Sequence, residues 1–437
     1  MIDIIAYPSD EAERKISEIA KRRPGADPAL EAEVSGIIEA VKVEGDAAVL
    51  RYSRRFDAPG LEVAQLCVSD AEIDAACGNV DLEFLTIIRT AIRNIEDFHK
   101  QQIRHSHFMT KSDGTFLGQI VRPVRAAGLY IPGGRGGETP LISSVLMNAI
   151  PARLAGVPEI ALVTPPRSDG SINPYLLAAA REVGVSRIHR AGSAWGIAAL
   201  AYGTQSIPPV DVIVGPGNIY VALAKKLVSG TVGIDMIAGP SEILVLADSS
   251  ARADYIAADL LSQAEHDIMA SSICITTEES LAGDIALCVS RQLSALPRSE
   301  TAAASIERYG AVFVAKSMDA AVALANRIAP EHLELHIKDP LPWLGRIENA
   351  GAVFIGDHSP EPVGDYFAGP NHVLPTAGTA RFASALGVDD FLKKTSVIAY
   401  SRAAFDRDAR SIIRLAELEG LTAHAESVRI RLEEGSR

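Results

Sequence analysis

Cysteine is scarce in this chain and positive charge is not in excess, and both absences exclude classes of protein. The 437 residues contain only four cysteines, Cys67, Cys77, Cys274 and Cys288, and no two of them form a C-x-x-C pair. A thiolate zinc knot and a disulfide framework are therefore excluded. The formal net charge of −13 leaves no basic surface large enough to neutralise a phosphate backbone, so we expect no nucleic-acid partner.

Long hydrophobic runs are also missing. Residues 191–210 carry no charge over the length of a bilayer span, but glycines and prolines such as Gly196 and Pro208 make the stretch too broken to cross a membrane. We interpret it as a buried, Ala-rich helix followed by a loop. The first residues lack the basic and apolar regions of a secretory signal, so the sequence predicts a cytoplasmic protein with no membrane partner.

Short β-branched runs alternate with Ala-rich helical stretches from about residue 130 onward. The pattern predicts strands at 159–164, 187–190, 210–214, 242–247, 272–276, 311–315 and 351–355, with helices between them. This order is typical of parallel sheets covered by helices on both faces, so the predicted fold class is α/β, in two units. Charged helices are predicted at both ends of the chain, over 10–22, 31–51, 403–418 and 423–433.

The usual nucleotide signatures are absent. Gly215-Pro-Gly217-Asn-Ile-Tyr220 begins a G-x-G-x-x-G pattern but has tyrosine where the third glycine belongs, and no Walker pattern occurs. Three Gly-rich turns, at 130–137, 215–218 and 238–242, nevertheless lie where strands are expected to begin or end. Such turns can form either a ligand crevice or plain structural turns. Thr139 and Pro140 predict a helix start whose free N–H groups suit an anion.

Two histidines occur in patterns that suit metal binding or proton transfer. Gln263 and His266 are three residues apart, which places both on one face of a helix, and both side chains can ligate zinc. Glu331 and His332 are adjacent where a helix is expected to pass into a strand, and they offer two proton-transfer groups of different basicity. An ordinary helix end and a solvated charged turn are the alternatives for each pair alone.

Further oxygen and nitrogen donors lie in polar segments nearer the C-terminus. Asp365 and His372 belong to a long polar loop, where functional residues tend to concentrate, and Asp365 is a candidate metal ligand. Glu419 and His424 lie in a turn between two predicted helices. Together with the earlier pairs, these residues form a set of nitrogen and oxygen donors that could hold a borderline metal such as zinc without any cysteine.

Seven motifs in this chain resemble those of the histidinol dehydrogenase family in order and spacing. They are Tyr130-Ile-Pro-Gly-Gly, Ser144-Val-Leu-Met-Asn-Ala-Ile-Pro-Ala, Gly215-Pro-Gly-Asn, Ala238-Gly-Pro-Ser-Glu, Gln263-Ala-Glu-His, Pro330-Glu-His-Leu-Glu and Gly369-Pro-Asn-His-Val-Leu-Pro-Thr. The resemblance extends from about residue 30 to about residue 430. It implies a zinc-dependent, NAD-linked enzyme that oxidises L-histidinol to L-histidine through histidinal, consuming two NAD and one water.

The resemblance also implies a role for each matching residue. One zinc per subunit would be held by Gln263, His266, Asp365 and His424. His332 would be the base that takes the alcohol proton, and Glu331 would activate the water that attacks the aldehyde. Substrate contacts would come from the metal ligands, His332, Ser241, His372 and Glu419. Tyr130, Trp195 and Asn218 would border NAD, and Trp195 departs from the family by replacing a common glutamine with a stacking surface.

The architecture that the resemblance implies is a domain-swapped homodimer with two incomplete Rossmann-like domains, each a three-layer sandwich. We expect an N-terminal helical segment over 1–23, a first domain made of 24–129 and 243–386 with the metal and catalytic residues, and a second domain over 130–242 on the NAD side. A helical tail, 387–437, would reach the partner and bring Glu419 and His424 to its active site.

Two other functions remain open from the sequence. A paralogous zinc- and NAD-dependent dehydrogenase could keep the metal site and oxidise another small alcohol, such as a sulfonated diol. A protein without catalytic activity, built on the same fold, could bind a metal or a nucleotide. The presence of Glu331, His332, His372 and Glu419 together favours histidinol, because a ligand without an imidazole and an amine would not need the same contacts.

Overall fold

The computed structural model describes residues 2–22, 28–134, 137 and 139–433. It divides into two compact units, which we call unit 1 and unit 2. Unit 1 comprises Met1–Gln102 and Val124–Phe391, and unit 2 comprises Ile103–Pro123 and Leu392–Arg437. Within the described ranges, no helix is long and apolar enough to cross a membrane.

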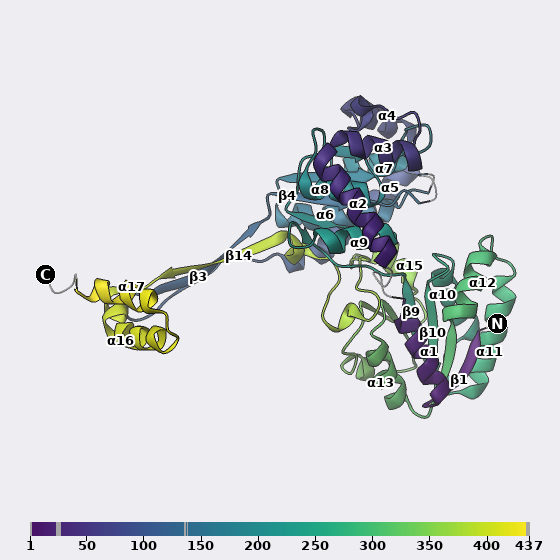
Figure 1. The fold of residues 1–437 in the computed structure, drawn as a ribbon. Coiled ribbons are helices and arrows are strands. Elements are labelled where there is room, and N and C mark those ends of the chain that lie inside the picture. The colour runs from purple at the N-terminus through teal and green to yellow at the C-terminus, as the bar shows by residue number, and fades with distance from the viewer. Residues whose placement is uncertain (1, 23–27, 135–136, 138, 434–437) are drawn as a thin grey trace. The chain divides into compact units, whose positions relative to one another are not determined.

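Unit 1 contains a six-stranded parallel sheet that carries the candidate active site. Its strand order is β1 (Asp3–Tyr7), β11 (Ala311–Ala315), β10 (Ser271–Thr276), β9 (Glu242–Ala247), β12 (His332–His336) and β13 (Ala352–Ile355). Helices α1 (Asp10–Ala20) and α13 (Met318–Ile328) cover one face. Helices α10 (Ala253–Ala264), α11 (Glu279–Leu293) and α12 (Ser299–Tyr309) cover the other, as Figure 1 shows. Strands buried on both faces read as continuous apolar runs, which is why they are visible in the sequence.

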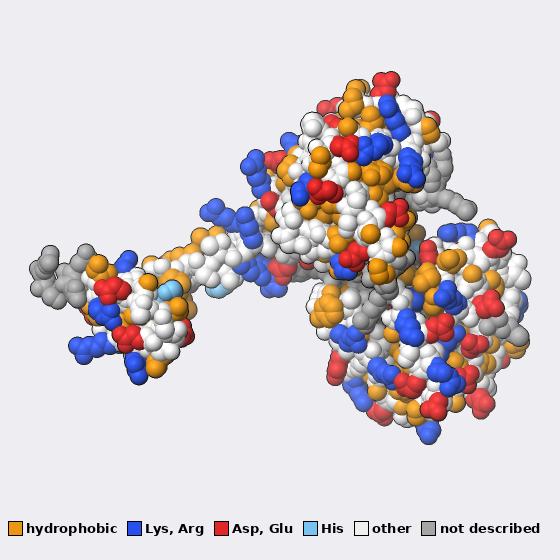
Figure 2. All heavy atoms as spheres, in the orientation of Figure 1, with side chains coloured by type: hydrophobic (Ala, Val, Ile, Leu, Met, Phe, Trp, Pro, Cys, Tyr) orange, Lys and Arg blue, Asp and Glu red, His pale blue; other side chains and the backbone are white. Residues whose placement is uncertain are grey.

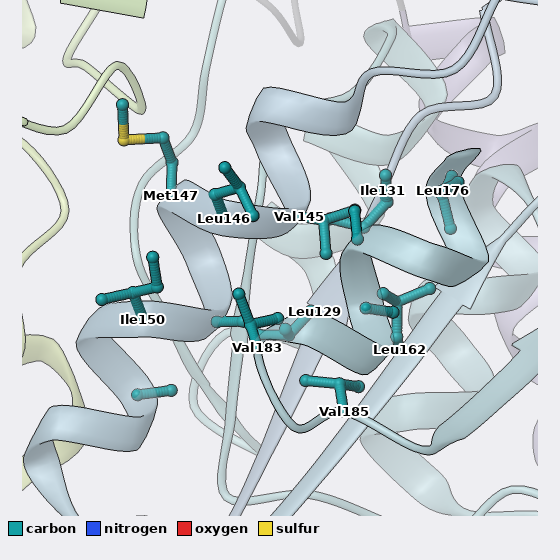
Figure 3. Packing of buried hydrophobic residues seen from close by; sticks show 14 of the residues in the cluster. Leu129, Ile131, Val145, Leu146, Met147, Ile150, Leu162, Leu176, Val183 and Val185 are labelled. Atoms are coloured by element: carbon teal, nitrogen blue, oxygen red, sulfur yellow. The ribbon is translucent and has the colours of Figure 1, made fainter. Parts of the chain in front are cut away.

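Unit 1 also contains a five-stranded parallel sheet, in the order β6 (Arg187–Arg190), β5 (Glu159–Thr164), β4 (Ala126–Tyr130), β7 (Val212–Val214) and β8 (Gly233–Ile234). One face packs against α2 (Pro28–Glu44), α3 (Asp46–Phe56), α8 (Ser193–Tyr202) and α9 (Ile219–Val228). The other packs against α4 (Asp70–Asn79), α5 (Leu82–His99), α6 (Ile142–Ala155) and α7 (Pro174–Glu182). Figure 3 shows this second core, where Leu129 and Leu162 of the sheet lie among α6 and α7 side chains such as Val145 and Leu176.

Unit 2 combines an antiparallel sheet with a helical hairpin. The sheet has the order β14 (Leu392–Ala399), β3 (Phe116–Pro123) and β2 (His107–Thr110). Helices α16 (Arg402–Leu418) and α17 (Thr422–Glu433) follow it. Figure 2 shows lysine and arginine side chains interspersed with aspartate and glutamate on the visible face of each unit, so the net negative charge is not gathered into one field there.

The predicted α/β class and the parallel sheets are confirmed, but the predicted grouping of segments differs from the structure. Helices α2 to α5, within the segment 24–129, pack on the five-stranded sheet, and β4 is one of its strands. Of these helices, α5 also contacts the turn Gly364–Ala368. The N-terminal segment supplies strand β1 to the six-stranded sheet as well as a helix. Residues 387–437 are not only helical, because β14 pairs with β3.

One predicted helix is divided in two. The expected helix over 31–51 is interrupted at Gly45, whose φ of 61° lies in the left-handed region. An α-helix cannot continue through that conformation, so α2 ends at Glu44 and α3 begins at Asp46.

Candidate active site

The amino ends of β9 and β12 form the floor of the candidate site. The two strands pair in parallel with His332 opposite Ile243, so Glu331 and His332 lie beside Ser241 and Glu242. Helix α13 ends where Ala329 adopts a left-handed φ of 54°, and the proline that follows prevents continuation of the helix. The prediction that Glu331 and His332 lie at a helix-to-strand junction is confirmed.

The ring of His332 is held in one orientation. Its Nδ1 lies 2.9 Å from the backbone carbonyl oxygen of Glu242. A carbonyl only accepts, so Nδ1 carries the hydrogen and Nε2 keeps its lone pair. Nε2 is buried without a hydrogen-bond partner among the described residues. Burial lowers the pKa of His332, so the ring is neutral and able to accept a proton at Nε2.

Glu331 is buried next to His332. Its Oε2 accepts a hydrogen bond of 2.9 Å from the backbone N–H of Glu242 and lies 3.8 Å from Nδ1 of His332. Burial raises the pKa of Glu331 well above its ordinary value, and the nearby negative charges of Glu242 and Asp365 raise it further, against the lowering by the Glu242 N–H. A carboxylate of raised basicity is suited to take a proton from water.

Two of the predicted metal ligands of unit 1 lie close enough to this pair to act on its charges, Asp365 on Glu331 and His266 on His332. Gln263 is near the C-terminal end of α10, 1 % exposed, and its Oε1 has no hydrogen-bond partner within the described ranges. His266 follows the end of α10 and is exposed, and its charge lowers the pKa of both His332 and His372 after the larger effect of burial. Asp365 belongs to a π-helical turn, Gly364–Ala368.

Asp365 has two polar neighbours that bear on metal binding. Its Oδ1 lies 3.7 Å from Nδ1 of His372, whose Nε2 is buried without a partner in the described part of the chain. Burial and the adjacent Glu361 carboxyl raise the pKa of Asp365 to about 8. One ligand atom each from His332, Glu361 and Asp365 lies within 4.8 Å of the others.

These observations fit a divalent cation bound through nitrogen and oxygen. The lone pairs of Gln263 and His372 are buried without hydrogen bonds, and Asp365 is in a buried cluster of carboxyl groups, which a cation would neutralise. The sequence prediction missed Glu361. Only its place four residues before Asp365 could have pointed to it.

A second buried cluster adjoins the first. His336 and Glu334 lie on one face of β12 with Nε2 and Oε2 3.3 Å apart, and Oδ2 of Asp259 on α10 is 3.6 Å from the same Nε2. The backbone N–H of Glu361 donates to Glu334, 2.9 Å away, which links the two clusters. Polar and apolar residues alternate over 332–336, and this alternation predicts that Glu334 and His336 lie on one face of the strand. It does not predict that Asp259, on α10, lies beside them.

Glu419 and His424 lie in unit 2, on the hairpin formed by α16 and α17. Both line one hollow of the hairpin together with apolar side chains such as Leu415 and Leu421. Within unit 2, the structure brings these two predicted site residues together.

A second candidate site lies at the carboxyl ends of β4 and β7. In the sheet, β5 lies on one side of β4 and β7 lies on the other, so the strand order reverses direction between β4 and β7. Ligands of open α/β sheets bind at the carboxyl ends of the strands where the order reverses. Tyr130 ends β4, is 4 % exposed, and its hydroxyl accepts a 3.1 Å hydrogen bond from the Ser193 N–H. Asn218 follows β7, is exposed, and caps α9 by accepting from the N–H groups of Tyr220 and Val221.

Two expectations about this edge are wrong. Trp195 offers no stacking surface, because its ring is 4 % exposed, stacks on Tyr52 and Phe56, and donates a 3.0 Å hydrogen bond to Ser53. The expected helix start at Thr139 and Pro140 is also displaced, because α6 begins at Ile142 without a side-chain cap. Residues 135, 136 and 138 of the preceding loop lie outside the described ranges.

Comparison with known proteins shows what the chain as a whole is similar to. The family model described as histidinol dehydrogenase matches residues 20–432. The histidinol dehydrogenase of Desulfotalea psychrophila is 54 % identical over 424 residues, covering 97 % of this chain and 98 % of the relative. That of Geobacillus kaustophilus is 55 % identical over 402 residues, covering 92 % and 94 %. The crystal structure of histidinol dehydrogenase from Elizabethkingia anophelis superposes with a TM-score of 0.91 at 37 % identity, covering 100 % of this chain and 99 % of that chain.

These matches define the class of protein as an NAD-dependent oxidoreductase. Within that class, the chain belongs to the histidinol dehydrogenase family.

Proposed function

We propose that this chain oxidises L-histidinol to L-histidine through L-histidinal, in two successive hydride transfers to NAD with one water consumed. The observation that carries the proposal is the orientation of His332, whose Nδ1–H is fixed by the Glu242 carbonyl while Nε2 is free to act as a base. Family membership supports histidinol as the substrate.

In the first step, His332 acts as the general base. Its Nε2 accepts the proton of the substrate hydroxyl while the carbon–hydrogen bond breaks and its electron pair leaves as hydride to NAD. The products are the aldehyde, NADH and one proton. The neutral state of His332 suits this role, because burial lowers its pKa and leaves the lone pair available.

In the second step, Glu331 acts on water. Its carboxylate accepts a proton from the water that attacks the aldehyde carbon, and the proton held on Nε2 of His332 passes to the aldehyde oxygen, which gives the hydrate and frees Nε2. Nε2 of His332 then accepts a hydroxyl proton as the second hydride leaves to NAD, and the acid product forms. The raised pKa of Glu331 makes its carboxylate a stronger base than an exposed glutamate, which supports the assignment.

We assign Gln263, His266 and Asp365, with His424 of the partner subunit, as the ligands of one zinc ion. When bound, zinc supplies a Lewis-acid anchor that orients the amine and imidazole of the substrate. The unpartnered Oε1 of Gln263 supports this assignment. Ser241, His372 and Glu419 would contact the substrate.

We further propose a domain-swapped homodimer with shared active sites. Unit 2 exposes apolar side chains on its hairpin, with Leu415 62 %, Leu418 64 % and Ile430 52 % exposed. An apolar surface of this kind typically packs against a partner. Covered by a second chain, the hairpin would bring Glu419 and His424 to the partner's site.

The NAD site is assigned to the carboxyl edge of the five-stranded sheet, at Tyr130 and Asn218. The change of strand direction between β4 and β7 supports this placement. Trp195 is left out of the assigned site because its ring is covered by its neighbours in the core.

The stoichiometry of NADH tests the proposed reaction. The chain loaded with zinc is mixed with limiting histidinol and excess NAD, and two NADH are expected for each histidinol consumed. No turnover of histidinol, together with oxidation of another small alcohol, would instead establish a paralogous dehydrogenase. Binding of zinc and NAD with no turnover of any alcohol would indicate a binding protein.

Variants test the residue roles. His332→Asn is expected to lower kcat for both histidinol and histidinal by about a thousandfold, whereas Glu331→Gln is expected to slow histidinal oxidation more than histidinol oxidation. His189→Asn is a matched control, because His189 is also a buried histidine with an unpartnered Nε2, and it lies on β6 of the other sheet. Parental activity in His332→Asn would refute the assignment of the base.

Mixing two inactive variants tests the shared sites. His332→Asn changes unit 1 and His424→Ala changes unit 2, so a heterodimer with swapped units would contain one doubly altered site and one unaltered site. We expect activity to return when the two proteins are refolded together. No recovery from a verified heterodimer would show that each site is built from a single chain.

A further inference from the structure

Arg22 is a buried arginine at the end of α1 that connects three segments of unit 1. Its guanidinium donates to the carbonyl oxygens of Ile19, 3.0 Å away, and Met269, 2.6 Å away. It also donates to Oε1 of Glu242 at 2.6 Å, and the two side chains are 2 % and 9 % exposed. A charge pair this deeply buried is retained only when its geometry is well satisfied.

Glu242 is the residue that holds both proposed proton-transfer groups. Its backbone N–H donates to Oε2 of Glu331, and its carbonyl oxygen accepts from Nδ1 of His332, each at 2.9 Å. A shift of the Glu242 backbone would therefore move the carboxylate of Glu331 and rotate the ring of His332 together.

We propose that Arg22 is a positioning residue for the oxidation of histidinol. By holding the side chain of Glu242, it fixes the backbone groups that orient Glu331 and His332. Arg22 acts through Glu242, because within the described ranges its side-chain hydrogen bonds go to Ile19, Met269 and Glu242 and not to Glu331 or His332. The inference rests on the roles proposed above for Glu331 and His332.

The ion pair also accounts for the burial of a second carboxyl group beside Glu331. The negative charges of Glu242 and Glu331 disfavour each other in the low-dielectric interior, and Arg22 is the cation that pairs with the first of them. Without Arg22, the Glu242 side chain would have to turn toward water or take up a proton. Either change would disturb the strand end on which His332 depends.

Steady-state kinetics of Arg22→Gln tests the proposal. A displacement of a catalytic group by about 1 Å costs about 100-fold in rate, so we expect kcat for histidinol to fall by about 30-fold or more. The KM values for histidinol and NAD should change by less than about threefold, because the proposed zinc ligands and NAD contacts are not altered. Arg22→Lys, which keeps the charge, should recover part of kcat.

Arg190→Gln is the matched control for a merely structural effect. Arg190 is 4 % exposed and, like Arg22, it pairs with one carboxylate and with backbone carbonyls, at Glu72, Gly170 and Gln65. It belongs to the five-stranded sheet, so its variant should lose stability while the folded fraction keeps the parental kcat.

Three outcomes would overturn the proposal. They are parental kcat in Arg22→Gln, a loss confined to KM, or an equal loss of kcat per folded molecule in Arg190→Gln. If Arg22→Gln does not fold, Glu242→Gln replaces it, since this change keeps an acceptor for Arg22 and removes the charge. We expect a fall in kcat of about tenfold, and parental kcat would refute the proposal. Full activity of His332→Asn in the same series would separately refute the proposed base.

Discussion

Replacing Lys225 by methionine should destabilise unit 1 strongly. Lys225 on α9 forms a buried ion pair with Asp235, and the two side chains are 2 % and 0 % exposed. Its Nζ also donates to the carbonyl oxygen of Gly215 at 3.0 Å, while Oδ2 of Asp235 accepts from the Gly215 N–H at 2.8 Å. Methionine keeps the packing of the stem and removes the charge, so Asp235 is left buried without its cation.

The expected loss follows from the cost of an uncompensated buried charge. Removing one partner of such a pair costs about 3–5 kcal/mol. The double variant Lys225→Met/Asp235→Asn, which removes both charges, should be more stable than the sum of the single changes predicts, by about 1–3 kcal/mol. Lys226→Met is the control, because Lys226 is 41 % exposed, pairs with Glu31 at the surface, and should change stability by less than about 1 kcal/mol.

The assay is urea denaturation at neutral pH, followed by circular dichroism. Loss of the Gly215 contacts should also raise KM for NAD, since the loop from Gly215 to Asn218 belongs to the assigned NAD site. The reasoning would be refuted if Lys225→Met matched Lys226→Met in stability. Strict additivity of the two charge removals would show that the ion pair is not energetically coupled.

Three further changes have defined outcomes. Burial raises the pKa of Asp57 to about 7 from an ordinary value of 3.8. Between these two pH values the folded state keeps a proton that the unfolded state has lost, so the free energy of unfolding should fall as pH rises from about 4 to about 7. Asp57→Asn should remove this dependence, on the order of 4 kcal/mol in total, in denaturation curves measured across that range; an unchanged pH slope would contradict it. Gly215→Ala places a Cβ 2.2 Å from the carbonyl oxygen of Tyr130 at a residue with a φ of 116°. It should therefore raise KM for NAD and lower Tm more than Gly230→Ala, because Gly230 has a φ of 98° but open space around it. Equal effects of the two changes would show that the clash at Gly215 is relieved. Trp195→Phe should cost about 1 kcal/mol for the lost indole hydrogen bond and leave KM for NAD unchanged, and a raised KM would restore Trp195 to the cofactor site.

The elements of the two sheets were largely predictable from local patterns. Strands such as β9 and β11 are mostly apolar runs because both of their faces are buried, and the turn into β12 follows from Pro330. Local patterns do not show which segments pair, and the grouping of 24–129 with 243–386 that the resemblance implies differs from the packing of α2 to α5 on the five-stranded sheet. Strand β1 is not predictable from its five residues, because so short a segment shows no clear hydrophobic periodicity. Its pairing partner β11 also lies about 300 positions away in the sequence.

The residues of the candidate site were predictable where side chains able to bind metal or transfer protons lie a few positions apart in the sequence, as in Glu331-His332 and Gln263-Ala-Glu-His266. Glu361 and Arg22 were not, because their importance comes from contacts across long stretches of chain. Trp195 was misjudged for a related reason, since the two aromatic rings that cover it belong to α3, far away in sequence.

The position of β1 at the edge of the six-stranded sheet has a consequence for synthesis on the ribosome. Its partner β11 is synthesised only when the ribosome reaches Ala315, so β1 has no strand to pair with until then. The last strand of the five-stranded sheet, β8, ends at Ile234, so that sheet can fold earlier. Arg22 and Glu242 then meet late, when the N-terminal segment docks. Extensions placed before β1 should therefore slow the recovery of activity after refolding more than the recovery of helical structure.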